Sequence, residues 1–450
     1  MASICTSNVT SGFIDLATFD EIEKYLYGGP DATAYFVRET RKSTWFTQVP
    51  VVLSRASGSP AFNQEWSVSI SRAGDYLLNT WLRLQTPAVE LVAQPPSGAT
   101  LLRWTRNFMH NIIRECCITF NDLVAARFDS YHLDFWSAFT VPAGKRNGYN
   151  NMIGSFPAMV QGGASIAAFT LNLPLPFFYT RDSGVALPTA ALPYNEMRIN
   201  FAFRDWSDLL IGVNAGAAGA TQRVALTAAD LRNGSPVLGT TQVWSDYAIV
   251  SNDERKRMAC APRDILIEQV QTAPRQAFTP GTNAQQSFDV RFSHAIKVIF
   301  FSVRNRSFKA EWSNYMTKSP VTAGVVTNFT PDGSADPILQ TSLIYENTNR
   351  LAQMGSDYFA LVNPYYHAPV IPLDTGYHMY SYSLDFICLD PMGSTNYGKL
   401  TNVSIVPEAS AAAVAEANDA EWPQTYEFIV TAVNNNIIRI SGGALGFPVL

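Results

Sequence analysis

Residues 173–203, LPLPFFYTRDSGVALPTAALPYNEMRINFAF, decide the fold class of this chain of 450 residues. The stretch begins as an apolar run broken by prolines, which cannot donate the backbone hydrogen bond that the interior of a sheet or a helix requires. From residue 197 to residue 203, apolar residues then alternate with polar or small ones, a period-two pattern that is typical of a half-buried strand. The stretch therefore predicts two strands joined by a turn-rich connector across the edge of a β-sandwich.

Further strand candidates flank this stretch on both sides, and turn signals separate them. Up to residue 250 the candidates are residues 34–37, 45–53, 66–70, 76–84, 112–120, 173–179, 197–203 and 243–250. From residue 265 onward they are residues 265–271, 288–292, 298–303, 341–345, 377–386, 403–406, 426–433 and 437–440. The chain is therefore expected to contain two β modules of similar length, each a barrel or a sandwich.

A charged segment separates the two modules. Residues 253–257, DERKR, stand ahead of Pro262, and neither a helical nor a strand-like apolar period continues through them. We interpret residues 253–263 as a solvated linker, in a chain longer than the size at which one core keeps growing. The predicted parts are an N-terminal arm (residues 1–30), a first β domain (residues 31–252), this linker and a second β domain (residues 264–450).

Two short helices are expected outside the strands. In the arm, Thr18 and Glu21 have the spacing of a helix N-cap and its reciprocal partner, and the apolar residues around them trace one helical face. That face must dock either on the same chain or on a neighbour, and the sequence allows both. Residues 130–139 carry aromatic residues at helical spacing, which predicts an inserted helix whose rings belong to a core.

The composition excludes some classes of function. A chain that is 47% hydrophobic and 12% aromatic suits large globular cores, and no apolar run approaches the roughly 20 residues that cross a bilayer. The 32 basic and 37 acidic residues give a net charge of −5, the wrong sign for a protein that neutralises phosphates, so direct contact with nucleic acid is not expected. The N-terminus lacks a basic segment followed by an apolar one, which favours a cytosolic origin over secretion.

No pattern in the sequence indicates catalysis, a metal or a cofactor. The five histidines are His110, His132, His294, His367 and His378. None of them stands in an HExxH pattern or beside a cysteine pair at zinc spacing, and neither GxSxG nor a phosphate-binding lysine loop is present. The pairs Asp129 with Asp134 and Asp385 with Asp390 have the residue type of a glycosidase, but nothing in the sequence positions them. We therefore expect a protein that is not an enzyme.

Long parts of the chain resemble the major capsid proteins of nucleocytoplasmic large DNA viruses, and the iridovirus type in particular. Residues 173–203 resemble the centre of the first barrel of those proteins. The other matching segments are TSGFIDLATFDEIEKYLYGG (10–29), SISRAGDYLLNTWLRL (69–84), RWTRNFMHNIIRECCITFND (103–122), RDILIEQVQTAPR (263–275), RFSHAIKVIFFSVRN (291–305), LIYENTNRL (343–351), DPMGSTNYGKLTNVS (390–404) and NNNIIRISGGALGFPVL (434–450). The resemblance therefore covers almost the whole chain.

This resemblance implies an all-β double jelly roll: two consecutive eight-stranded antiparallel β-sandwiches with short inserted helices. It also implies a structural role, in which homotrimers with a nearly hexagonal outline form capsomers that tile the icosahedral shell of a virion assembled in the host cytoplasm. The implied partners are neighbouring capsomers, minor capsid proteins and an inner viral membrane, which lies beneath the shell and is not spanned by the chain. In that family, the N-terminal arm lies at the inner face of the shell.

The candidate assembly contacts are Leu16, Phe19 and Ile22 in the arm and Phe447 and Leu450 at the C-terminus. Two other classes of protein are compatible with a β-rich chain. A carbohydrate-binding or hydrolytic β-sandwich would be a monomer with a groove lined by exposed tryptophans and paired carboxylates. A minor capsid or vertex protein would have a low copy number in the particle.

Overall fold

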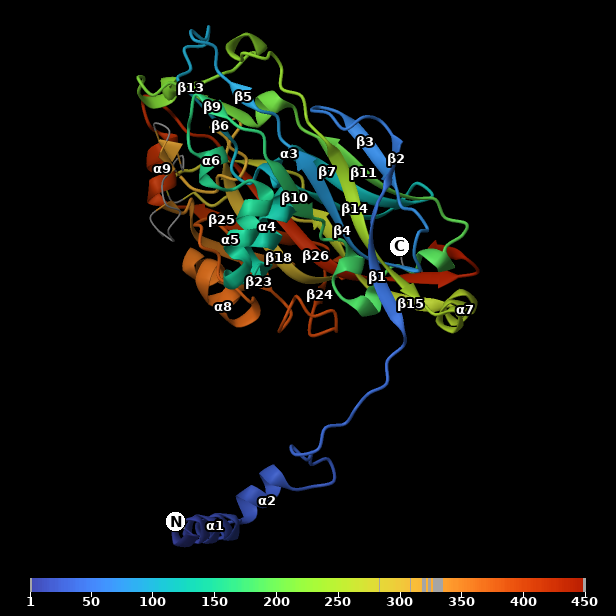
Figure 1. The fold of residues 1–450 in the computed structure, drawn as a ribbon. Helices are drawn as coiled ribbons and strands as arrows, with labels where there is room; N and C mark the ends of the chain where they lie inside the picture. Colours follow the sequence, from blue (N-terminus) through green and yellow to red (C-terminus); the bar gives the residue numbers. More distant parts are fainter. Residues whose placement is uncertain are drawn as a thin grey trace. The chain divides into compact units, whose positions relative to one another are not determined.

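The computed structural model describes residues 2–282, 284–307, 309–317, 321–322, 325–326 and 335–447. The chain divides into two compact units, residues 1–45 and residues 46–450. The second unit contains the β-structure (Figure 1). Among the described residues, no helix combines the length and the apolar character that a membrane crossing requires.

The first half of the β unit is a sandwich of two antiparallel sheets. The strands of the four-stranded sheet, in spatial order, are β1 (Phe46–Val52), β14 (Thr241–Val250), β4 (Tyr76–Gln85) and β10 (Thr170–Pro174). Those of the five-stranded sheet are β2 (Ser54–Ser57), β3 (Glu65–Ser69), β11 (Met197–Phe203), β7 (Ile113–Phe120) and β8 (Leu123–Asp129). Strands that are consecutive along the chain often lie in different sheets, as in a jelly roll.

The second half repeats this connectivity. One sheet has, in spatial order, β15 (Arg263–Thr272), β26 (Tyr426–Ser441), β18 (Ala295–Asn305) and β23 (His378–Ser381). The other has β17 (Phe288–Asp289), β25 (Val403–Ala409), β21 (Ile338–Tyr345) and β22 (Thr348–Gly355). If β2 is set aside and the eight main strands of each half are numbered along the chain, both halves have sheets of order 1-8-3-6 and 2-7-4-5. The predicted double jelly roll is therefore confirmed.

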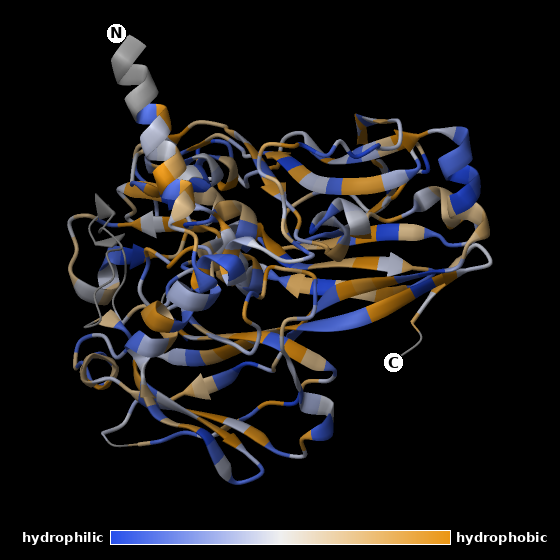
Figure 2. Ribbon diagram, turned by 90° about the horizontal axis from the view of Figure 1, so that it is seen from below, coloured by the Kyte–Doolittle hydropathy of each residue, from blue (hydrophilic) through white to orange (hydrophobic). Residues whose placement is uncertain are grey.

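The stretch that decides the fold joins the two sheets of the first jelly roll. β10 belongs to the four-stranded sheet and β11 to the five-stranded one, so the connector crosses between them as predicted. β11 has the predicted bounds and strictly alternating burial, and hydrophobic and hydrophilic residues alternate along many strands (Figure 2). The first strand, predicted to reach residue 179, is wrong beyond Pro174, because Pro174 and Pro176 cannot extend the ladder and short 3-10 turns follow.

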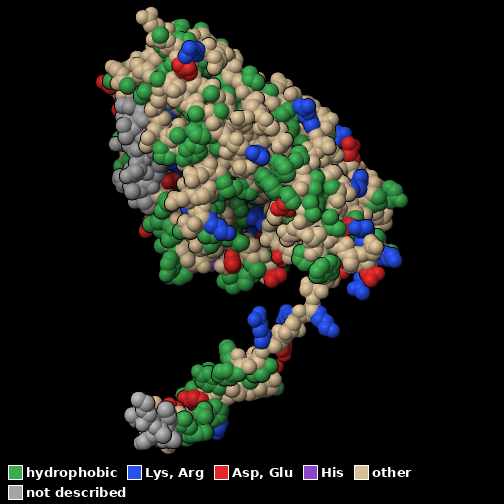
Figure 3. Space-filling model, viewed as in Figure 1, with side chains coloured by type: hydrophobic (Ala, Val, Ile, Leu, Met, Phe, Trp, Pro, Cys, Tyr) green, Lys and Arg blue, Asp and Glu red, His purple; other side chains and the backbone are tan. Residues whose placement is uncertain are grey.

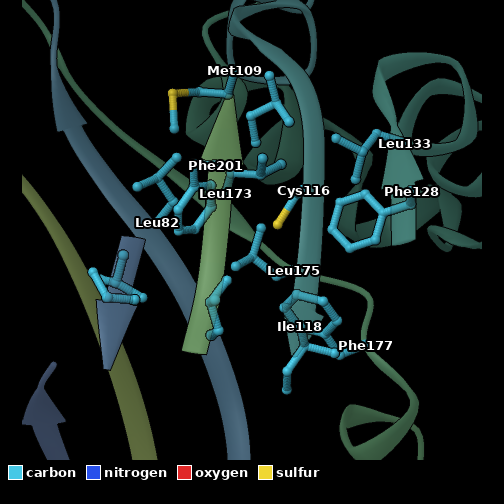
Figure 4. Packing of buried hydrophobic residues seen from close by; sticks show 14 of the residues in the cluster. Leu82, Met109, Cys116, Ile118, Phe128, Leu133, Leu173, Leu175, Phe177 and Phe201 are labelled. Atoms are coloured by element: carbon cyan, nitrogen blue, oxygen red, sulfur yellow. The ribbon is translucent and has the colours of Figure 1, made fainter. Parts of the chain in front are cut away.

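Three hydrophobic clusters hold the β unit together. The first fills the space between the sheets of the first jelly roll, where Leu82, Leu173 and Phe201 lie close to Cys116 and Ile118 (Figure 4). The second fills the second jelly roll. The first cluster also contains residues of the second half, from β15, β26 and β27 (Ala444–Gly446). The hydrophobic interior of the first jelly roll therefore extends past the linker.

Helices are inserted between the fifth and sixth main strands of both halves. In the first half these crossover helices are α4 (Ser130–Thr140), α5 (Ala143–Ile153) and α6 (Pro157–Val160), so the helix predicted over residues 130–139 is confirmed. In the second half a π-helical turn, η8 (Tyr358–Val362), continues directly into α8 (Asn363–His367). The two halves therefore share both their sheet order and the position of their helices.

Smaller elements lie in the connectors. They are α3 (Phe108–Ile112), α9 (Ala411–Ala417), β5 (Val89–Glu90), β6 (Leu101–Trp104), β9 (Ser165–Ile166), β12 (Leu210–Val213), β13 (Arg223–Val224), β16 (Gln276–Phe278), β19 (Val321–Thr322), β20 (Val325–Val326) and β24 (Thr395–Asn396). β5 pairs with β9, and β12 pairs with both β6 and β13. Three long connectors of the first jelly roll are thus joined to one another.

Asp230 ties two of these connectors together. Its carboxylate accepts hydrogen bonds from the backbone nitrogens of Ser97 (2.9 Å) and Thr227 (2.7 Å). Burial alone would raise the pKa of Asp230, but these hydrogen bonds stabilise the ionised form and lower the pKa to about 2. The carboxylate therefore keeps its charge, and both contacts, over the whole range of neutral pH.

The segment predicted as a solvated linker contains a helix, α7 (Asn252–Cys260). Its sequence shows no apolar period because only Met258 of this helix is buried. Asp253 and Glu254 lie in the first turn, where the helix dipole favours negative charge, and Arg255 donates to Asp75 (2.7 Å). The segment is thus an ordered helix held against the first jelly roll, and the division into domains at residues 253–263 stays a prediction.

The arm contains two helices, α1 (Ala2–Ala17) and α2 (Glu21–Tyr27). Thr18 does not cap the second helix as predicted: Asp20 does, accepting a hydrogen bond from the nitrogen of Glu21 (2.8 Å). The hydroxyl of Thr18 instead donates to the carbonyl of Asp15 (2.6 Å). α1 was not predicted, because its Ser-rich and Thr-rich sequence has weak helix propensity. The strand expected at residues 34–37 does not form.

His132 in α4 gives the first jelly roll a specific acid sensitivity. The ring is fully buried, neither nitrogen has a hydrogen-bond partner among the described residues, and burial, assisted by Arg181, lowers its pKa to about 3. An unfolded chain binds a proton at this histidine below its ordinary pKa of about 6.5, whereas the folded chain does not. The stabilisation of the folded state by the neutral His132 ring is therefore complete above the ordinary pKa of about 6.5, and is lost as the pH falls toward the folded-state pKa of about 3.

Replacing His132 with phenylalanine is expected to remove this contribution. Between about pH 7.5 and about pH 5, the free energy of unfolding of the wild type should fall by about 2 kcal/mol relative to that of the variant. Urea denaturation at a series of pH values measures the difference. Parallel pH profiles for the two proteins would contradict the assignment.

Candidate assembly surfaces

The crossover helix α4 of the first jelly roll covers the second jelly roll. Phe135 and Phe139 both stack on Phe300 of β18, with ring centroids 5.9 Å and 5.4 Å apart. They belong to a third hydrophobic cluster, formed with residues of β23 and β26 that point away from the core of the second jelly roll. The outer face of its four-stranded sheet is thus an interface within the chain.

Asp134 of α4 anchors a buried polar network across this interface. Its Oδ1 accepts a hydrogen bond from Nδ1 of His110 (2.7 Å), and its Oδ2 accepts from the hydroxyls of Ser313 (2.8 Å) and Tyr315 (2.9 Å). The other ring nitrogen of His110, Nε2, lies 2.6 Å from the hydroxyl of Tyr149, and in the neutral ring with the proton on Nδ1 it accepts the hydrogen bond from this hydroxyl. Burial raises the pKa of Tyr149 and of Tyr315, so both hydroxyls keep the protons that they donate.

Trp312 forms a second link between the halves. Its ring contacts two guanidinium groups, Arg204 from the first half (3.8 Å from the ring centroid) and Arg304 from the second (4.3 Å), and its Nε1 donates to the carbonyl of Asp208 (2.7 Å). Arg304 also donates to Glu427 (2.9 Å). Burial lowers the pKa of Arg204 to about 10, which leaves it cationic at neutral pH and suited to a cation–π contact.

One cluster has the residue types of a hydrolase triad without its geometry. Nε2 of His378 lies 2.6 Å from Oγ of Ser356 and 2.8 Å from Oδ2 of Asp336, while Nδ1 has no partner within the part of the chain that the structure describes. A catalytic relay needs the nucleophile and the orienting carboxylate on opposite ring nitrogens. Here the carboxylate takes the position that the relay reserves for the serine, so this buried cluster is not a nucleophilic relay.

Asp129 and Asp134, one of the two carboxylate pairs considered as glycosidase candidates, each have a structural role. Asp129 caps α4 by accepting from the backbone nitrogen of His132 (3.0 Å), and Asp134 belongs to the buried network. Within the described part of the chain, no group of three or more His, Cys, Asp or Glu residues could hold a metal ion.

The predicted assembly residues fall into different places. Leu16, Phe19 and Ile22 lie in the arm unit and expose 73%, 51% and 71% of their surface. Hydrophobic side chains gather along the described part of the arm (Figure 3). Phe447 is half-buried and packs against the first hydrophobic cluster, and Leu450 lies outside the described residues. The three arm residues therefore form an exposed apolar set, whereas Phe447 already has partners within its own chain.

Sequence reasoning missed one exposed apolar surface. The crossover helix of the second jelly roll exposes Leu361 (42%), Val362 (41%), Tyr365 (70%) and Tyr366 (72%). We call these four residues the crossover ridge. Their spacing of three to four residues was a helical signal in the sequence, but Pro364 beside them obscured it. Pro364 is tolerated because it lies in the first turn of α8.

The repeated strand order places the chain in the class of double jelly-roll proteins. Comparison with known proteins agrees. The family model "Major capsid protein N-terminus" matches residues 34–250, and the model "Large eukaryotic DNA virus major capsid protein" matches residues 254–446. The chain belongs to the major capsid protein family of large eukaryotic DNA viruses. It is a structural protein of the viral capsid.

Relatives and solved structures support this assignment over the full length. The major capsid proteins of Costelytra zealandica iridescent virus and Lymphocystis disease virus 1 are 67% and 50% identical, each covering 100% of both chains. A subunit of the PBCV-1 virus capsid model has a TM-score of 0.75 at 20% identity, covering 93% of this chain and 100% of the other. The Faustovirus major capsid protein has a TM-score of 0.71 at 12% identity, covering 94% and 95%. These two structures share the fold.

Proposed function

We propose that three copies of the chain form a capsomer with a nearly hexagonal outline, which tiles the facets of an icosahedral shell. The observation that carries the proposal is the repeated connectivity of the two jelly rolls. A three-fold axis then relates six similar barrels, and this gives a quasi-sixfold outline from three identical chains. Strong contacts within the closed trimer leave weaker lateral patches for growth of the lattice.

The proposal extends to the partners and the place of assembly. Neighbouring capsomers and minor capsid proteins bind the trimer, an inner viral membrane lies beneath the shell, and the particle assembles in the host cytoplasm. The chain is not an enzyme, binds no cofactor and does not contact the genome, as its net charge of −5 supports. The two jelly rolls correspond to domains 31–252 and 264–450, which the limits of the two family matches support.

Two measurements on the purified full chain test the proposal: sedimentation velocity in dilute, reducing solution and then negative-stain imaging. We expect a species of three chain masses with a hexagonal outline. A stable monomer at all concentrations, under conditions in which the chain is folded, would contradict the trimer and would direct attention to glycan binding.

The arm gives a separate prediction. Changing both Phe19→Asp and Ile22→Asp places two charges on exposed apolar positions of the arm unit, so the jelly rolls should fold and unfold as in the wild type. Assembly into shells should weaken, because charged residues are unfavourable in the desolvated centre of an interface. The yield of particles from cells that express the variant measures the effect, with Glu23→Asp in the same helix as the control. A soluble variant with unchanged particle yield would remove the arm from the assembly contacts.

A further inference from the structure

The equivalent four-stranded sheets of the two jelly rolls differ in what covers their outer faces. In the second jelly roll, β18 is buried at all but one position, because its inner face meets its own core and its outer face meets α4. In the first jelly roll, the equivalent strand β4 alternates between buried and less buried positions. The outer face that α4 covers in the second jelly roll is therefore left open on the equivalent sheet of the first jelly roll.

One cross-strand row of the open face is apolar on all four strands, and polar residues such as Asn79 and Arg83 stand in the rows beside it. Val52, Trp244, Trp81 and Pro174 are direct cross-strand neighbours on the four strands of this sheet. Val52 is 39% exposed, Pro174 is exposed, and the two half-buried tryptophans stack with ring centroids 6.3 Å apart. Tryptophan and proline in a row on an outward face are unusual for a sheet that faces only water.

A groove of about 950 Å³ opens beside this row. Trp81 and Pro174 line it on the side of the sheet, and Tyr149 and Met152 line it on the side of α5. The molecule is visibly hollowed on the face that carries these elements (Figure 3). We call the groove and the Trp81–Trp244 row together the sheet groove. It is long enough to hold several side chains, and aromatic anchors that fill pockets dominate the energetics of many interfaces.

The crossover ridge has the pattern that fits such a groove. In α4, the residues that cover the second jelly roll are Tyr131, Phe135, Ala138 and Phe139, which recur at helical spacing and are buried. In the equivalent helix of the second jelly roll, Leu361, Val362, Tyr365 and Tyr366 recur at the same three-to-four-residue spacing and are exposed. The outward side of α4 is thus covered by a sheet, whereas the outward side of its counterpart, which packs on β23 with its other side, has no sheet against it within the part of the chain that the structure describes.

We propose that the crossover ridge of one copy packs into the sheet groove of a second copy, and that this contact repeats between copies the packing of α4 within the chain. The inference rests on the proposed trimer and names the surfaces that form it. Each copy offers one ridge and one groove, so the contact is heterologous, and three such contacts close a ring in which first and second jelly rolls alternate. Equivalence with the internal interface favours a second copy over any other occupant, because the equivalent helix and the equivalent sheet face are already complementary once within the chain.

A photo-cross-linking experiment tests the contact directly. Benzoylphenylalanine replaces Tyr366, purified trimers of the full chain are irradiated, and the band at twice the chain mass is sequenced. We expect position 366 to be joined to residues 76–85, 170–174 or 241–250 of another copy. The same photoreactive residue in place of Tyr194, which is 76% exposed but lies in the connector before β11, should not give these products. Products that join position 366 to residues 8–45 would assign the arm, and not the sheet groove, as the partner of the ridge and overturn the proposal, as would trimers without any covalent dimer.

Substitutions give an independent test of the same contact. The ridge variant, with Tyr365→Asp and Tyr366→Asp, and the groove variant, with Trp81→Asp, should each raise the concentration for half-maximal trimer by at least about tenfold in sedimentation experiments. Mixed in equal amounts, the two variants retain one intact ridge and one intact groove between them. The mixture should therefore form a dimer of the two variants and no closed trimer.

The outcomes separate this inference from the proposed function. If the wild type forms no trimer, the proposed function fails. If the wild type forms a trimer and the folded ridge variant, checked by near-ultraviolet circular dichroism, forms it equally well, only the ridge–groove contact is overturned. Tyr194→Asp is the matched control, and it should leave the trimer unchanged.

Discussion

Replacing Asp134 with alanine is expected to lower the free energy of unfolding by about 3–5 kcal/mol, because it removes the acceptor of a buried network and leaves its donors unpaired. Asp134 is 1% exposed, and its two oxygens accept hydrogen bonds from His110, Ser313 and Tyr315. These donors belong to both halves of the chain, so the loss should loosen the contact between the jelly rolls and not only one core. Urea denaturation followed by far-ultraviolet circular dichroism measures the change.

Two controls make this result specific. Asp134→Asn keeps the shape and one acceptor oxygen, so it should lose less stability than Asp134→Ala. Asp390 is exposed, and Asp390→Ala should change the free energy of unfolding by no more than about 0.5 kcal/mol. If Asp134→Ala were as harmless as Asp390→Ala, the network would contribute nothing to stability.

Replacing Trp312 with alanine is expected to lower the free energy of unfolding by about 3–5 kcal/mol as well. The substitution removes the two cation–π contacts of the Trp312 ring and leaves the buried guanidinium groups of Arg204 and Arg304 without that aromatic partner. The same urea denaturation applies. Because Arg204 comes from the first half and Arg304 from the second, this loss also acts on the contact between the jelly rolls.

Trp312→Phe separates the ring from its nitrogen. Phenylalanine keeps an aromatic face for both arginines but cannot donate to the carbonyl of Asp208, so about 1 kcal/mol should be lost. A loss as large as that of Trp312→Ala would show that the hydrogen bond, and not the stacking, holds this position.

Local patterns in the sequence predicted the strands well where packing follows the local pattern. β11 has the predicted bounds because its alternation matches a sheet with one face in the core. The strand predicted over residues 173–179 was too long, because an apolar run after a proline looks the same whether it forms a ladder or fills a core. α7 was missed for the opposite reason: an exposed charged helix has no apolar period.

The buried polar network around Asp134 could not be predicted, because it depends on contacts between residues that are far apart in the sequence. Asp134 meets Ser313 and Tyr315 only because α4 lies on the outer face of the second jelly roll, and no spacing in the sequence announces such a meeting. The equivalence of the two halves was also invisible as sequence identity, and it became evident from strand order alone. The arm residues, in contrast, were predicted from local apolar spacing, and three of them are exposed as a docking face requires.

The length of β26 has a mechanical consequence. Its 16 residues extend over roughly 50 Å, and its side chains enter all three hydrophobic clusters. One continuous strand therefore connects the cores of both jelly rolls. Bending one jelly roll against the other would strain the hydrogen bonds that pair β26 with β15 and β18. A subunit reinforced in this way is stiff, so in the proposed shell the curvature has to arise at the contacts between capsomers and not within a subunit.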